Sequence, residues 1–145
     1  LEKWGLAHEF HYRGVLDRRQ KIEFLRTLDV LSVPATYDEP KGIFLLEAMA
    51  CGVPVVEPRR GAFTEVIEKT AGGLLVEPDD TEALAAAIFK LYRDPALAAT
   101  LGDNGFRAVR EHYTVARMAD RTLEVYRRLE AGNEHDLKTF HQVTR

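Results

Sequence analysis

Short apolar segments alternate with helical patterns through the first half of the chain, and this alternation constrains the fold more than any other feature. Strands are predicted at Glu9–Arg13, Val30–Val33, Val53–Glu57 and Leu74–Glu77. A helical pattern separates each strand from the next. Strand–helix–strand repetition predicts the α/β class, with a Rossmann-like parallel sheet of about four strands and helices flanking it.

The helices of this half have recognisable start and stop signals. Asp17 and Gln20 have the spacing of a capping box before the first helix. The next helix is predicted from Gly42 to about Ala50, and the third from about Ala62 to Lys69.

The second half is helical throughout. Three helices are predicted, the first after Asp80, the second from Pro95 and the third after Thr114, a suitable N-cap residue. Each helix has one apolar face, so we expect all three to pack on the sheet rather than to form a separate domain. The apolar periodicity is lost from Gly132 onward.

Length and composition limit the class of protein. A chain of 145 residues fits one domain, which we expect to occupy residues 1–131, with a polar tail at 132–145. Lys and Arg number 20 and Asp and Glu 23, a net charge of −3 that argues against nucleic acid as a partner. No apolar run approaches the roughly 20 residues of a transmembrane segment. The single cysteine and the absence of a signal-peptide pattern favour a cytoplasmic location.

The most informative stretch is Tyr37–Pro58, whose helix is apolar almost all the way round except for Glu47. A carboxylate in an apolar helix needs a partner, because its desolvation is expensive. That partner is either a protein group, such as a hidden Arg or a neighbouring strand, or a ligand that donates hydrogen bonds, such as a vicinal diol. The helix alone does not decide between the two.

Glu39 lies just before the same helix. By itself it is explained as a capping charge at a helix N-terminus. Glu47 lies roughly 7–8 Å along the helix axis from Gly42, and the free N–H groups of the helix start lie between the two carboxylates, where phosphate binds well. A diphosphate placed there would put one sugar beside Glu39 and the other beside Glu47, which is the outline of a nucleotide-sugar.

These residues resemble the donor-binding motif of retaining GT-B glycosyltransferases of family four, the group 1 type. That family carries Glu-x7-Glu, here Glu39 to Glu47, followed by Ala-Met-Ala-x-Gly-x-Pro-Val-Val, here Ala48 to Val56. The flanking segments also match in order, at Phe10–Leu16, Asp29–Pro34, Gly61–Glu65 and Gly73–Asp80. The resemblance implies that residues 1–131 are part of the C-terminal, nucleotide-sugar-binding domain of a GT-B fold.

The resemblance also implies roles for individual residues. The catalytic position is Glu39, which contacts the transferred sugar, and Glu47 holds the ribose hydroxyls. The other substrate-binding positions are the backbone around Lys41, Gly42 and Ile43 for sugar and phosphate, and Gly14 and Val15 near the nucleobase. Lys41 departs from the family, which usually has an aromatic residue there.

Arg60 follows the end of a strand, where open α/β sheets bind ligands. It is a candidate for phosphate or acceptor contact. A solvated basic turn explains it equally well.

The implied reaction transfers a hexose from a nucleotide-diphospho-sugar to a hydroxyl acceptor with retention, without a metal or another cofactor. The implied partners are the donor and an N-terminal acceptor domain that is missing here, as are two strands that family members have before Glu9. The chain alone is therefore expected to be inactive. The alternatives are another GT-B enzyme, such as a nucleotide-sugar 2-epimerase or a phosphorylase, and a non-catalytic flavodoxin-like binding module.

Overall fold

A computed structural model describes the backbone of residues 2–143 and the side chains of residues 3–130. Its sheet consists of two parallel strands, β1 (Val55–Pro58) and β2 (Gly73–Val76), in register from Val55 opposite Gly73 to Pro58 opposite Val76. One more parallel bridge joins Leu31 to Val55 on the other side of β1. The α/β class and the parallel sheet are confirmed.

The expected number of strands is wrong. The segment Val30–Val33 pairs with β1 only around Leu31, whose N–H donates to Pro54 O at 3.0 Å and whose carbonyl accepts from Val56 N at 3.0 Å. The ladder stops there because the next available donor, Val33 N, bonds to the side chain of Glu57 instead.

The strand expected at Glu9–Arg13 is also absent. Residues Ala7–Glu9 form the 3₁₀ turn η2, and the residues after it are extended and exposed, with Tyr12 81% accessible. No strand of the described chain pairs with them, so their backbone groups face water and form no ladder.

The helices follow the predicted capping signals closely. Asp17 and Gln20 form the complete capping box of the first long helix. Asp80 caps the first helix after the sheet, through a bond from Ala83 N to its carboxylate. The helices are η1 (Glu2–Trp4), α1 (Arg18–Leu25), α2 (Ile43–Ala50), α3 (Ala62–Thr70), α4 (Thr81–Arg93), α5 (Pro95–His112) and α6 (Val115–Val143).

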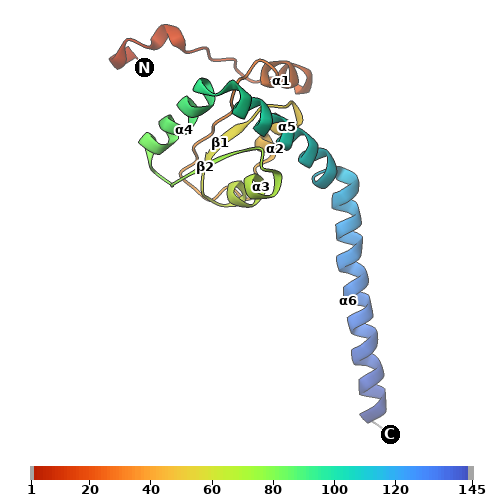
Figure 1. The fold of residues 1–145 in the computed structure, drawn as a ribbon. Coiled ribbons are helices and arrows are strands. Elements are labelled where there is room, and N and C mark those ends of the chain that lie inside the picture. The colour runs from red at the N-terminus through yellow and green to blue at the C-terminus, as the bar shows by residue number, and fades with distance from the viewer. Residues whose placement is uncertain (1, 144–145) are drawn as a thin grey trace.

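The core lies on both faces of β1, so the sheet is covered on two sides (Figure 1). Val55 is fully buried among side chains of α2 and α3, including Phe63. Its neighbour Val56 points to the other face and packs with Leu91 of α4 and Leu101 of α5. This alternation fixes β1 in the centre, so its carboxyl end and the loops around it have a rigid base.

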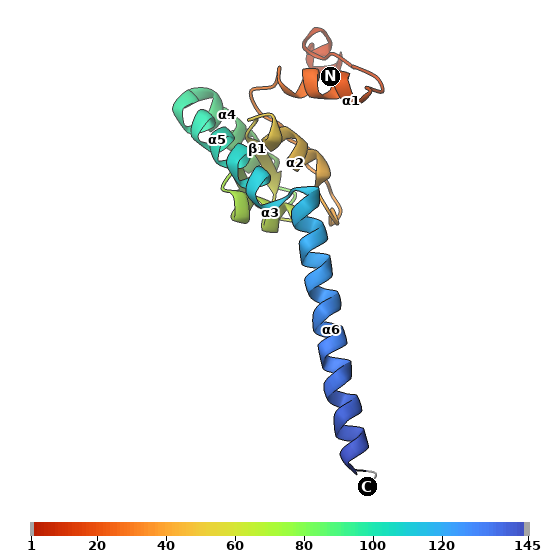
Figure 2. The ribbon, with the colours of Figure 1, turned by 90° about the vertical axis from the view of Figure 1, so that its right-hand side faces the viewer.

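Packing of the third C-terminal helix on the sheet was expected, and this prediction is wrong. α4 contacts both strands and α5 contacts α2 and α3, but α6 leaves the compact part and projects away from it (Figures 1 and 2). Its apolar residues Met118 and Leu129 are 64% and 61% exposed. The turn at Tyr113–Thr114 directs the helix outward, so that only its first turns lie near α2, where Leu46 and Met118 line the same hollow.

The helix α6 also continues through Gly132 to Val143, so the expected polar tail does not begin with a change of secondary structure. The division into residues 1–131 and 132–145 stays a prediction. Among the described residues, no helix combines the length and the apolar character that crossing a membrane requires.

Candidate functional site

The loop from Val33 to Gly42, hereafter the Glu39 loop, ends where α2 begins. Oε1 of Glu39 accepts hydrogen bonds from the backbone N–H groups of Lys41 and Gly42, both at 3.1 Å. These bonds, with that of Gly42 the stronger influence, hold the pKa of Glu39 below its usual 4.5. The side chain is therefore an ionised carboxylate at the entrance of the helix, which fits the capping explanation and leaves Oε2 with only a long contact of 3.4 Å from the Tyr37 hydroxyl.

Gly42 makes the entry into α2 possible, because it adopts φ +63° and ψ +39°. Its carbonyl accepts from the N–H groups of both Leu45 and Leu46. The N–H groups of Ile43 and the residue after it belong to the first turn, where no intrahelical acceptor exists. Lys41 and Ile43 are exposed. The start of α2 thus presents backbone donors at the surface, as an anion site requires.

Glu47 lies on the same helix, and its partner is a lysine. Nζ of Lys21, on α1, lies 2.6 Å from Oε1 of Glu47, and the two side chains are 42% and 35% exposed. Glu47 is therefore neither sealed inside the core nor paired with a hidden Arg. The carboxylate keeps an accessible side, so a ligand that donates hydrogen bonds can still reach it.

Gly14 and Val15 lie in the exposed segment that leads into α1. Gly14 has φ +65°, and Val15 is 98% exposed. The ion pair between Lys21 and Glu47 connects this part of the chain to α2. Sequence reasoning did not identify Lys21, because an exposed lysine in an amphipathic helix has no distinctive pattern.

Arg60 lies in the connection between β1 and α3, and its guanidinium already has two protein partners. Nη1 donates to the backbone oxygen of Thr36 at 2.5 Å, and Nη2 lies 2.6 Å from Oδ2 of Asp79. The side chain is only 19% exposed. Arg60 is therefore not part of a solvated turn, and direct contact with a substrate stays a prediction.

Glu57, on β1, is a second residue that sequence reasoning missed. It is completely buried, and its two carboxylate oxygens lie 3.0 and 3.2 Å from Val33 N. Burial raises its pKa from 4.5 to about 7. A signal was available, since a carboxylate directly after the apolar run Val53–Val56 of a buried strand is unusual.

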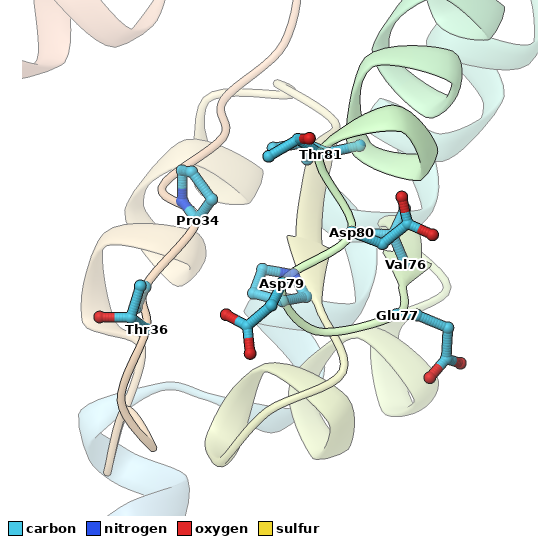
Figure 3. A pocket seen from close by; sticks show the side chains of 10 residues that line it. Pro34, Thr36, Val76, Glu77, Asp79, Asp80 and Thr81 are labelled. Atoms are coloured by element: carbon cyan, nitrogen blue, oxygen red, sulfur yellow. The ribbon is translucent and has the colours of Figure 1, made fainter.

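A pocket of about 180 Å³ opens at the carboxyl end of the strands, between the Glu39 loop and the turn from β2 to α4 (Figure 3). One wall carries Pro34 and Thr36, and the other carries Val76, Asp79 and Thr81. The Asp79 carboxylate points toward the segment that carries Thr36, and Arg60 joins the two walls there. Neither Glu39 nor Glu47 lines this pocket, so a pocket shared by the two carboxylates stays a prediction.

The fold is that of the C-terminal domain of GT-B glycosyltransferases. The family model described as Glycosyl transferases group 1 matches residues 1–108, and the chain belongs to this family. It is 39% identical over 128 residues to the alpha-maltose-1-phosphate synthase of Mycolicibacterium smegmatis, an alignment that covers 84% of this chain and 33% of that protein.

Solved structures agree with this assignment. Sucrose-phosphate synthase from Thermosynechococcus elongatus matches with a TM-score of 0.80 at 34% identity, over 90% of this chain and 33% of that one. Anabaena HepE, solved in complex with UDP-glucose, matches with a TM-score of 0.78 at 25% identity, over 86% of this chain and 34% of that one. The chain thus spans about a third of the length of the relatives it matches.

Proposed function

We propose that this chain is the donor-binding part of a retaining glycosyltransferase that moves a hexose from a nucleotide-diphospho-sugar to a hydroxyl acceptor. The observation that carries the proposal is the start of α2. The ionised Glu39, which the buried N–H of Gly42 holds in place, and the exposed residue Ile43 of the first turn lie at one end, and the accessible carboxylate of Glu47 lies further along the same helix. The UDP-glucose complex of the similar HepE supports a nucleotide-sugar as the donor.

Each residue has a defined part in this proposal. Glu47 accepts hydrogen bonds from the two ribose hydroxyls, and the backbone from Lys41 to Ile43 donates to the sugar and the phosphate. Glu39 faces the transferred hexose, where its negative charge stabilises the positive charge that develops at the anomeric carbon. The backbone at Gly14 and Val15 lies against the nucleobase.

In the proposed reaction, the bond between the anomeric carbon and the diphosphate oxygen breaks while the acceptor oxygen bonds to that carbon from the same face. The acceptor proton passes to the departing phosphate. The acceptor site belongs to an N-terminal domain, which the proposal places outside this chain, so the chain alone is inactive. The names of the matched relatives favour transfer over epimerisation or a non-catalytic role. A cytoplasmic location stays a prediction.

The test is a titration of the protein that contains this chain with UDP-, GDP- and ADP-glucose, measured by calorimetry. We expect one base to bind, and Glu47→Gln to weaken that binding tenfold or more, because hydrogen bonds to a charged acceptor are worth about 1.5–3 kcal/mol. Glu68→Gln is the matched control, since Glu68, on α3, is an exposed carboxylate that pairs with Arg59 and not with a residue of α1 or α2. Equal affinity of the wild type and Glu47→Gln, or no binding of any nucleotide-sugar, contradicts the proposal.

A further inference from the structure

The end of β1, the connection after it and the first residue of α3 hold the Glu39 loop at points spaced along its length. At the start of the loop, the Glu57 carboxylate accepts from Val33 N. At its far end, Ala62 N donates to the backbone oxygen of Glu39 at 2.8 Å. Arg60 binds between these two points. A loop of this length fixed only at its ends would keep conformational freedom that these bonds remove.

The bond in the middle of the Glu39 loop is made by the long side chain of Arg60. Arg60 donates to Thr36 O on the loop and pairs with Asp79 on the turn after β2. The planar guanidinium can serve two acceptors at once, in a geometry that the ammonium group of lysine does not reproduce. Because Asp79 orients the guanidinium, the position of Thr36 depends on a residue outside the loop.

The backbone of the connection also lies directly against Glu39. A Cβ atom at Gly61 would come within 2.5 Å of the Glu39 backbone oxygen and 2.7 Å of its nitrogen. Gly61 has φ +49° and ψ −138°, a conformation that is essentially restricted to glycine. Both the conformation and the close approach therefore require glycine here, and they place the connection and the Glu39 backbone in contact.

From these contacts we propose that the β1–α3 connection positions Glu39 for the donor sugar, with Arg60 acting as a positioning residue through Thr36 and Asp79. The inference rests on the proposed function, since it assigns a task to a site whose ligand is a nucleotide-sugar. It differs from a direct role of Arg60 at the phosphate, because it makes Asp79 equally important. Small displacements matter in such a site, where a shift of about 1 Å can cost roughly a hundredfold in rate.

The experiment compares Arg60→Ala, Asp79→Asn and the double variant in the protein that contains this chain. The probes are UDP-glucose and UDP, or the corresponding GDP or ADP pair if the titration above selects that base. We measure kcat for hydrolysis of the nucleotide-sugar and the Kd of the nucleotide diphosphate alone. Arg59→Ala is the matched control, because Arg59 lies in the same connection but pairs with Glu68 on α3.

Positioning predicts that Arg60→Ala lowers kcat by roughly ten- to a hundredfold while the Kd of the nucleotide diphosphate changes less than about twofold. Asp79→Asn is expected to lower kcat in the same direction, and the double variant to be no worse than Arg60→Ala, because both substitutions break one arrangement. Arg59→Ala is expected to behave like the wild type. Arg60→Lys, a milder change, is expected to lower kcat as well.

A large rise in the Kd of the nucleotide diphosphate in Arg60→Ala, with Asp79→Asn equal to the wild type, would overturn positioning in favour of direct phosphate binding. Unchanged kcat in both Arg60→Ala and Arg60→Lys would overturn it too. In each of these cases the wild type still binds and hydrolyses the donor, so the proposed function survives. A wild type that binds no nucleotide-sugar removes both proposals together.

Discussion

Lys21 and Glu47 lie 26 positions apart in the sequence, and the ammonium of one lies 2.6 Å from the carboxylate of the other. The pair joins α1 to the helix that carries the proposed ribose contact. Exposed ion pairs contribute little to stability, and both side chains are partly exposed. The effect of this pair is therefore expected on ligand binding, where Lys21 would orient the Glu47 carboxylate and add a positive charge near the proposed nucleotide site.

Lys21→Gln is accordingly expected to weaken binding of the nucleotide diphosphate by a factor of about three to ten, with little change in thermal stability. The affinity is measured by calorimetry at low and at high salt. The matched control is Arg19→Gln on the same helix, whose partner is Glu23. If Lys21→Gln and Arg19→Gln have the same affinity, Lys21 does not contribute to the site.

Glu57 makes the stability of the protein depend on pH. Its pKa is raised in the folded state from 4.5 to about 7, so the buried group favours folding below pH 4.5 and loses that contribution as the pH rises toward and through about 7. Glu57→Gln keeps an acceptor for Val33 N and has no proton to lose. We expect it to unfold several degrees higher than the wild type near pH 8, a gain on the order of 3 kcal/mol.

Below pH 4.5 the same two proteins are expected to unfold at similar temperatures, because Glu57 is then protonated in both the folded and the unfolded state. Thermal unfolding followed by circular dichroism across this pH range measures the difference. A constant offset between wild type and variant at every pH contradicts the assignment of the titration to Glu57.

Gly61→Ala is expected to destabilise the protein and to weaken donor binding. The strained backbone alone costs about 1–3 kcal/mol, and the new Cβ would collide with the Glu39 backbone. The control is Gly52→Ala, where φ is +80° but a Cβ meets nothing within 4 Å. Melting temperatures and donor titrations are compared, and equal losses in the two variants would show that the contact with Glu39 is unimportant.

Glu39 is expected to stay ionised throughout the range from about pH 5 to pH 8, because backbone hydrogen bonds from Gly42 and Lys41 hold its pKa below 4.5. Donor affinity across this range should therefore vary no more in the wild type than in Glu39→Gln. Calorimetric titrations at several pH values provide the measurement. A titration near neutral pH that disappears in Glu39→Gln would contradict this.

The features that depend on local chemistry could be predicted from the sequence. The capping box at Asp17, the cap at Thr114, whose hydroxyl accepts from Arg117 N, and the α2 start at Gly42 are set by a few neighbouring residues, so their spacing predicts them. The alternation of apolar strands and helices determined the α/β class. The motif from Glu39 to Glu47, with its flanks, was enough to identify the family that the comparisons confirm.

Which of those elements pair or pack with another depends on the tertiary structure. The residues from Phe10 to Arg13 have the composition of a strand but no neighbouring strand in the described chain, and the apolar residues of α6 that the structure describes are mostly exposed. The partners of the charged side chains also depend on the tertiary structure, because Glu47 meets Lys21, and Arg60 meets Thr36 and Asp79, only in the folded chain. Helix caps are local and can be predicted from a short stretch, whereas strand pairing, burial and ion pairs join residues that are distant in sequence and form only when the chain packs.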